Sequence, residues 1–225
     1  MGKRGPKPKE TINLTWSPEL AYVAGLMVSD GCLSKNGRHI DFTSKDREQI
    51  DNFLMCLNLE CKVTEKFSGY DGNRSLRVQF SNVPFYDFLL SIGLTPAKSK
   101  TIGAVGIPDK YFFDFLRGSF DGDGCFYSYW DKRWRSSHMF YVEFISASRE
   151  HIAWLRSMLK NKIGVLGHVV TDGKKATMQL KYAKKEALEI IGKMYYSPSV
   201  VSLSRKRIKI QKALVIEKEQ QQQYT

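Results

Sequence analysis

One stretch of the chain occurs twice, and this repeat constrains the fold more than any other feature. The first copy is residues 20–31 (LAYVAGLMVSDG) and the second is residues 113–124 (FDFLRGSFDGDG). Gly25 aligns with Gly118, and a cysteine follows each terminal Asp-Gly pair. Apolar and small residues at these spacings predict two helices that approach closely at their glycines. We expect each helix to stop at its Asp-Gly pair, with the glycine as a left-handed cap.

The two aspartates of these pairs, Asp30 and Asp123, are unfavourably placed for helix stability. A carboxylate in the last turn faces the negative end of the helix dipole and costs roughly 0.3–1 kcal/mol. The bland alternative is that each pair merely closes a helix, but the cost recurs at equivalent positions. If the helices pair through their glycines, the two carboxylates meet at one end and repel. A divalent cation would relieve that repulsion, and oxygen ligands with open positions suit Mg²⁺.

The two copies resemble the LAGLIDADG motif of the homing endonucleases, in the single-chain form that carries two motifs. The second copy, from Gly118 to Gly124, is close to the family pattern, whereas the first departs at Val28 and Ser29. The likeness extends from about Thr15 to Ile210, because the flanks repeat in order. It implies an α+β fold of two pseudo-symmetric αββαββα halves, which form a saddle with concave antiparallel sheets.

The resemblance also implies a function and a set of site residues. It implies a metal-dependent endodeoxyribonuclease that cuts both strands of a long, non-palindromic duplex, with Asp30 and Asp123 as metal ligands and no ligand assigned at residue 29. Mn²⁺ or Ca²⁺ would be alternatives to Mg²⁺. One lysine per half is expected beside the site, Lys98 (or Lys100 in its place) and Lys206. Where members often carry a polar amide on the second strand, this chain has Ser44 and Ser146.

The chain divides into five parts by this repeat and by its composition. They are a basic N-terminal arm (1–10), a first half (11–97), a Gly-rich linker (98–109), a second half (110–219) and a polar tail (220–225). The arm is either a frayed terminus or a segment that lies along a groove. A phrase at residues 42–50 recurs at residues 144–152, and residues 78–80 are aligned with residues 178–180, so the whole unit is duplicated.

Hydrophobic periodicity and turn residues predict the same order of elements in both halves. Ser17 and Pro18 start the first helix, and both motif helices end at their aspartates. Other predicted strands are 32–36, 39–43, 62–68, 76–80, 125–130, 140–146, 167–171 and 176–180. Further helices are a segment that opens at Lys45 and reaches Leu57, and 83–92, 149–163, 183–194 and 204–219.

The predicted strands alternate between a face toward the helices and an outer face. Val63 and Phe67 are expected to point inward, with Thr64 outward. We predict that the outer faces bind DNA, since a two-stranded ribbon fits the major groove and Arg, Lys and Gln read base edges. The candidate contacts are Lys62, Lys66, Arg77, Gln79, Tyr127, Tyr129, His168, Thr177 and Gln179, with Lys132, Arg133 and Arg135 on phosphates. The alternative is that these are solvated strand faces.

Charge and cysteine content narrow the class of protein. Lys and Arg number 35 against 23 Asp and Glu, a net charge of +12, which indicates a polyanionic partner and binding that weakens steeply with salt. An anionic membrane is the competing partner, but no run reaches the ~18 apolar residues of a spanning helix and no signal peptide is recognised. We expect a soluble, intracellular protein. The four cysteines lack zinc-site spacing and are expected to be reduced and mostly buried.

Three functions fit these features. The leading hypothesis is a monomeric site-specific endonuclease with double-stranded DNA as partner and no obligate protein partner. The first alternative is a maturase that assists splicing of its own intron RNA, which needs the basic surface but not the metal. The second is a non-catalytic DNA-binding regulator of the same fold. Two intact acids favour the nuclease.

Overall fold

The computed structural model describes residues 12–67, 74–134, 137–172 and 177–223, and it contains two repeated halves. The first half comprises α1 (Pro18–Ser29), β1 (Gly31–Leu33), β2 (His39–Ser44), α2 (Arg47–Leu57), β3 (Val63–Phe67), β4 (Arg74–Ser81) and α3 (Val83–Ser91). The second comprises α4 (Phe112–Asp123), β5 (Cys125–Trp130), β6 (His138–Ser146), α5 (Arg149–Ile163), β7 (His168–Asp172), β8 (Thr177–Ala183) and α6 (Lys184–Met194). Helix α7 (Ser204–Gln223) follows. The predicted α+β class and αββαββα order are confirmed.

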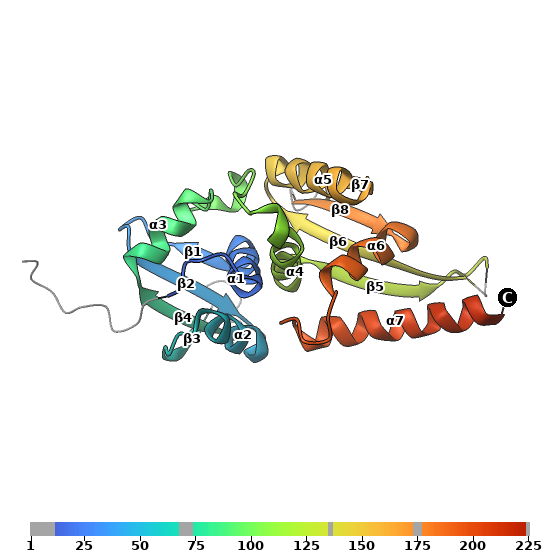
Figure 1. Cartoon of the computed structure of the whole chain (residues 1–225), viewed down its shortest axis with the longest axis horizontal. Coiled ribbons are helices and arrows are strands. Elements are labelled where there is room, and N and C mark those ends of the chain that lie inside the picture. Colours follow the sequence, from blue (N-terminus) through green and yellow to red (C-terminus); the bar gives the residue numbers. More distant parts are fainter. Residues whose placement is uncertain (1–11, 68–73, 135–136, 173–176, 224–225) are drawn as a thin grey trace, which may run out of the picture.

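Each half contains one four-stranded antiparallel sheet, with strand order β1-β2-β4-β3 in the first and β5-β6-β8-β7 in the second. One face of each sheet is buried against helices (Figure 1). In the first half Phe42 stacks on Phe53 of α2, with ring centroids 4.4 Å apart. In the second, Phe144 meets Phe120 of α4 edge to face at 6.0 Å. The other face of each sheet therefore carries the residues that are free to meet a partner.

Helices α1 and α4 lie side by side where the two halves meet (Figure 1). Ser17 caps α1, since its Oγ accepts a hydrogen bond from the Leu20 amide at 3.1 Å. A Cβ atom added to Gly25 would lie 2.1 Å from the Phe115 carbonyl oxygen, and one added to Gly118 would lie 2.0 Å from that of Tyr22. Only glycine fits at this crossing, as the motif predicted.

The glycines after the motif aspartates do not adopt the left-handed conformation that we predicted. Gly124 is extended (φ −72°, ψ 156°), and Gly31 already belongs to β1. Close packing explains the glycines instead. A Cβ atom on Gly31 would lie 2.7 Å from the Met27 Cα, and one on Gly124 would lie 2.6 Å from the Phe120 carbonyl oxygen. The chain turns from helix to strand so tightly that no side chain fits.

Several predicted boundaries were wrong by a few residues. Strand β1 ends at Leu33 rather than at residue 36, because Asn36 Oδ1 accepts from the Arg38 and His39 amides and closes the turn. Strand β8 continues to Ala183, and α7 continues to Gln223 into the expected polar tail. The 3₁₀ helices Lys98–Lys100 and Asp109–Tyr111 begin and end the predicted linker. The basic arm lies outside the described residues.

The alignment of residues 78–80 with 178–180 was also wrong, by two residues. The equivalent residues Phe42 and Phe144 pair with Val78 and Leu180, so Gln79 corresponds to Lys181 rather than to Gln179. The faces themselves are as predicted, because a shift by two preserves alternation.

Two expectations of burial were wrong. Phe67 lies on the inner face of its strand by register, but it is 66% exposed and is no part of the core. The four cysteines are free, as expected, yet Cys32 is exposed and the other three are half-buried.

Within the described residues, no helix is long and apolar enough to cross a membrane.

Candidate active site

The two motif acids lie at the same end of the paired helices. Asp30 is the C-cap of α1, and Asp123 is the last residue of α4. A Cβ atom on Gly122 would lie 1.8 Å from Ser29 Oγ and 2.9 Å from Asp30 Oδ2, so the two helix ends touch. The pairing of the helices thus brings one carboxylate from each half to the seam between the sheets.

The pKa values of both acids are raised. Burial raises the pKa of half-buried Asp30 to about 7, with the charge of Asp123 as the second cause and Lys206 and Gln49 opposing. Asp123 is exposed, but partial burial of its carboxylate still raises its pKa. The charges of Lys206 and Lys98 oppose this rise. Two acids that resist ionisation at one place form a site that favours a bound cation.

A buried lysine accompanies each acid. Lys98 Nζ donates to the Gly31 carbonyl oxygen at 2.5 Å, and Lys206 Nζ donates to the equivalent Gly124 carbonyl oxygen at 2.7 Å. Lys98 is 5% exposed and Lys206 is 6% exposed, whereas Lys100 is exposed. Burial lowers both pKa values, that of Lys206 to about 8. The structure therefore places Lys98, and not Lys100, against the first motif.

Gln49 is a site residue that the sequence analysis missed. Its Nε2 donates to Asp30 Oδ2 at 3.2 Å, and its Oε1 accepts from Ser44 Oγ at 2.7 Å. The amide thus comes from helix α2, while Ser44 on the second strand supports it. In the second half His151 holds the equivalent place, and its Nδ1 donates to the Gly103 carbonyl oxygen at 2.8 Å. Ser146 accepts from the Ser148 amide and does not support His151 in this way.

The outer face of the first sheet carries the residues predicted there. Lys66 and Gln79 are exposed, Lys62 is exposed just before β3, and Arg77 shares their face by register. Arg77 is not free, however, because its guanidinium pairs with Asp41 at 2.7 Å. This ion pair fixes the direction of the guanidinium, and the Asp41 carboxylate offsets its positive charge.

The outer face of the second sheet is aromatic rather than basic. Register places Tyr127, Tyr129, His168, Thr177 and Gln179 on it, together with Tyr141 and Lys181, which were not predicted. The three tyrosine rings lie nearly parallel, and those of Tyr127 and Tyr141 are 5.2 Å apart. In the β5–β6 loop Lys132 and Arg133 are exposed, with Arg133 3.3 Å from Asp131. Arg135 lies outside the described residues.

Comparison with solved structures identifies this arrangement. The LAGLIDADG meganuclease I-AabMI bound to uncleaved DNA superposes with a TM-score of 0.62 at 12% identity, over 92% of this chain and 92% of that one. I-SmaMI bound to DNA gives 0.61 at 13% identity, over 93% and 92%. The N-terminal LAGLIDADG domain of DUF199/WhiA gives 0.54 at 17% identity, over 84% and 88%. The chain has the LAGLIDADG fold. No family model and no curated protein matches the sequence.

Asp121 is a second residue of the LAGLIDADG motif that the sequence analysis passed over. Its carboxylate is fully buried and accepts from the Tyr22 hydroxyl at 2.8 Å and from the Leu203 amide at 2.7 Å. Burial raises its pKa to about 6, and these hydrogen bonds oppose the rise. The first motif has Val28 at this place, so only the second motif holds a neighbouring segment through a carboxylate.

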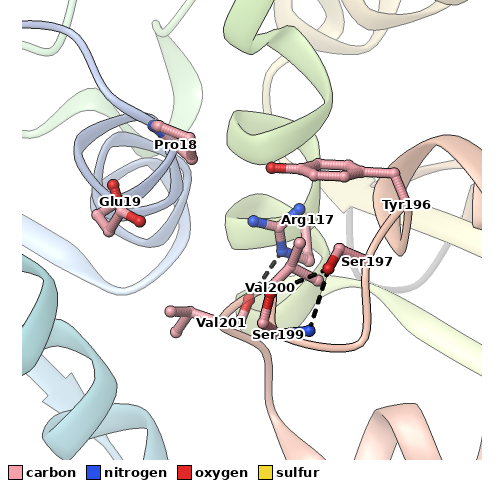
Figure 2. A pocket seen from close by; sticks show the side chains of 8 residues that line it. All are labelled: Pro18, Glu19, Arg117, Tyr196, Ser197, Ser199, Val200 and Val201. Atoms are coloured by element: carbon pink, nitrogen blue, oxygen red, sulfur yellow. Dashed lines mark hydrogen bonds between the residues drawn. The ribbon is translucent and has the colours of Figure 1, made fainter.

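A cavity of about 170 Å³ lies at the other end of α1 (Figure 2). Its lining includes Pro18, which precedes Asp30 by about 18 Å of helix. Arg117 beside it is buried, pairs with Asp114 at 2.8 Å and donates to the Val201 and Met194 carbonyl oxygens. Because these bonds fix the guanidinium within the protein and Asp30 and Asp123 lie at the other end of the helices, we assign this cavity a packing role and not a catalytic one.

The raised pKa of Asp30 leads to a prediction about stability. In metal-free protein the Asp30→Asn variant is expected to unfold with a free energy on the order of 1–2 kcal/mol higher than wild type at about pH 8. The folded pKa of about 7 lies above the unfolded value of 3.8, so wild-type stability falls as pH rises between them. The advantage should nearly vanish near pH 4. Denaturant unfolding in chelator across this range measures it, and a pH-independent difference would contradict the assignment.

Proposed function

We propose that the chain is a site-specific endonuclease that hydrolyses phosphodiester bonds in both strands of double-stranded DNA with a divalent cation. The observation that carries the proposal is the meeting of Asp30 and Asp123 at the seam of the LAGLIDADG fold, each with a buried lysine beside it. Structural neighbours bound to DNA support the choice of substrate. We further propose that the enzyme works as a monomer, because one chain supplies both motifs.

The donor atoms fit Mg²⁺, with Mn²⁺ or Ca²⁺ as alternatives. Both motif acids offer carboxylate oxygens, which hard divalent cations prefer. Burial raises the pKa of Asp30 and the charge of Asp123 adds to the rise, and a cation would offset both effects. In the part of the chain that the structure describes, no three His, Cys, Asp or Glu residues gather as a closed cage. Remaining positions would thus go to water and phosphate oxygens, which Mg²⁺ retains readily.

A bound cation would supply an activated water and offset the charge that develops on the phosphate. The residues of the chain do the rest. Lys98 and Lys206 place buried positive charges at the helix ends, where these charges would tune the attacking water and offset the charge that develops on the phosphate. Lys206 would act through its charge, because its three N–H groups donate to the Phe120, Gly122 and Gly124 carbonyl oxygens. Gln49 fixes the orientation of the Asp30 carboxylate through one hydrogen bond. Asp30 is itself half-buried, which limits the water that competes for its carboxylate.

We propose that the outer faces of both sheets hold the duplex. The first half would read it with Lys62, Lys66, Arg77 and Gln79, since Arg and Lys pair with guanine and Gln with adenine in the major groove. The second half would use tyrosine rings, His168, Thr177 and Gln179. We further propose that Lys132 and Arg133 contact phosphates, together with Arg135, which lies outside the described residues. The net charge of +12 supports such a polyanionic partner.

A non-catalytic DNA-binding regulator is the second candidate, because the WhiA domain shares the fold. It would need the outer faces but not the acids. The retention of both acids with raised pKa values, at a cost in stability, favours catalysis. The maturase alternative would be supported by intron splicing that persists when both acids are replaced.

The test uses a supercoiled plasmid whose insert consists of the two DNA segments on either side of the reading frame. The two segments are joined directly, without the reading frame between them. We expect linear product with Mg²⁺ and intact plasmid with chelator, because the carboxylates alone cannot activate water. A plasmid without the insert is the control for specificity. If the protein binds the insert but leaves it uncut with Mg²⁺ and Mn²⁺, the nuclease proposal fails and the regulator is supported.

A further inference from the structure

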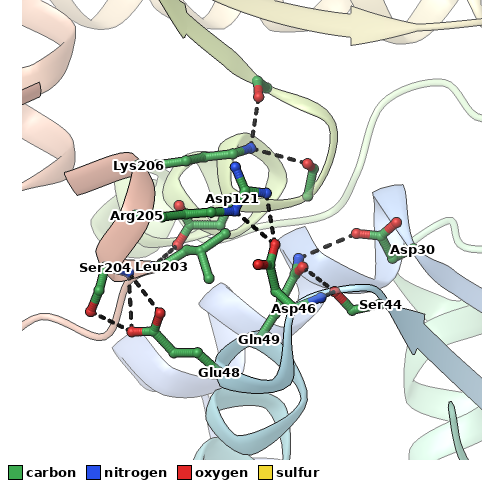
Figure 3. A network of polar contacts seen from close by, with 12 residues as sticks. Asp30, Ser44, Asp46, Glu48, Gln49, Asp121, Leu203, Ser204, Arg205 and Lys206 are labelled. Atoms are coloured by element: carbon green, nitrogen blue, oxygen red, sulfur yellow. Dashed lines mark hydrogen bonds and ion pairs between the residues drawn. The ribbon is translucent and has the colours of Figure 1, made fainter. Parts of the chain in front are cut away.

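Lys206 belongs to the second half, but residues of the first half hold the segment that carries it (Figure 3). Asn52 Nδ2 donates to the Ser202 carbonyl oxygen at 3.2 Å. The Glu48 carboxylate accepts from the Ser204 amide at 3.0 and 3.1 Å. These two contacts come from helix α2 and reach a segment about 150 residues further along the chain.

A third contact extends the same attachment by one residue. Asp46, the residue before α2, accepts from Arg205 Nε at 2.8 Å. Arg205 is the direct neighbour of Lys206. Contacts from α2 and its N-cap therefore reach three of the residues that lead up to the lysine, namely Ser202, Ser204 and Arg205.

The attachment uses the beginning of α7. Leu203 and Ser204 present amides that have no acceptor within the helix. Asp121 of the second half accepts from the Leu203 amide at 2.7 Å, and Glu48 of the first half accepts from the Ser204 amide. Carboxylates are favoured at this end of a helix by its dipole. Two successive amides, three and two residues before Lys206, are thus held by opposite halves.

The other lysine is held in the same crossed manner. Lys98 lies against the first motif, but the segment after it docks on helix α5 of the second half. Ser148 Oγ donates to the Ile102 carbonyl oxygen, and His151 donates to that of Gly103. Ser148 stands at the place equivalent to Asp46. Each half therefore holds the lysine segment that serves the other half.

We propose that these contacts form a crossed clasp in which Glu48 and Asp46 are positioning residues for Lys206, and Ser148 is one for Lys98. The clasp makes the position of each lysine depend on correct docking of the opposite half. Neither Asp30 nor Asp123 therefore has its lysine in place unless the two halves are docked. Its role in cleavage rests on the proposed nuclease function, whereas its effect on lysine burial does not.

Lysine acetylation measures the clasp without any need for cleavage. Brief treatment of the intact protein with acetic anhydride, followed by peptide mass spectrometry, should label Lys206 about tenfold faster in Glu48→Ala than in wild type. Lys98 should be unchanged. Ser148→Ala should reverse the pattern, and Asp51→Asn, an exposed acid on the same helix, should change neither lysine. Equal acceleration of both lysines in Glu48→Ala, or of neither, would overturn the clasp.

Plasmid cleavage then tests the role in the reaction. If each lysine serves one strand, Glu48→Ala should accumulate nicked circles, with the slower strand reduced about tenfold, and Glu48→Gln should recover most linear product because an acceptor oxygen is kept. Equal slowing of both strands would overturn the positioning role. If wild type cuts nothing, the proposed function fails, while the acetylation result still decides the clasp.

Discussion

Asp123→Asn should abolish cleavage, by about a thousandfold or more, and leave DNA binding intact. The substitution preserves the size and shape of the side chain but replaces an anionic ligand by a neutral amide. Asp123 lies beside Asp30 at the end of the paired helices and has two lysines near it. Loss of its charge would weaken cation binding. The negative charge that develops on the reacting phosphate would then no longer be offset by the cation. Affinity for DNA should hold or rise slightly, since a negative charge near the phosphates disappears.

Plasmid linearisation and a gel-shift assay with Ca²⁺ measure the two properties separately. The matched control is Asp87→Asn, the same chemical change at an exposed position on α3. It should cut like wild type. Normal cleavage by Asp123→Asn would remove the acid from the mechanism, and with it the assignment of the active site to Asp30 and Asp123. A loss of both cleavage and binding would instead indicate a folding defect, which thermal unfolding would reveal.

The placement of the two acids could be predicted because each belongs to a short local pattern that the chain repeats, whereas the lysines were implied only by the family resemblance. Spacing within one helix places Asp30 relative to Gly25, and Asp123 relative to Gly118, and the crossing of two such helices does the rest. The hydrogen bond from Gln49 to Asp30 could not be derived in this way. It depends on how α2 docks on α1, and the second copy has His151 at that position.

Long-range contacts and strand register could not be predicted from the sequence either. Glu48 meets Ser204 across 156 residues, and Glu150 occupies the same place in the repeat without showing which copy has which role. The two-residue error between Gln79 and Gln179 arose because alternation has a period of two, so a shift by two leaves every side chain on its expected face. Cys32 was expected inside because cysteine is usually buried, yet alternation places it on the outer face opposite Asp41.

Gly118→Ala should destabilise the protein more than any substitution in the site, by about 3 kcal/mol or more. The new Cβ would lie 2.0 Å from the Tyr22 carbonyl oxygen and 2.9 Å from its carbonyl carbon, which are backbone atoms and cannot rotate away. Helices α1 and α4 would have to move apart, and Asp30 and Asp123 would separate with them. Cleavage should therefore fall even at temperatures where the variant stays folded.

Gly192→Ala is the matched control for this prediction. Gly192 is an exposed glycine in helix α6, where an added Cβ has no atom within 4 Å. There alanine should raise the free energy of unfolding by about 0.5–1 kcal/mol through helix propensity. Denaturant unfolding of both variants measures the contrast. Equal stability of the two variants would mean that the helices do not meet at Gly118, and the seam on which the candidate active site depends would have to be placed elsewhere.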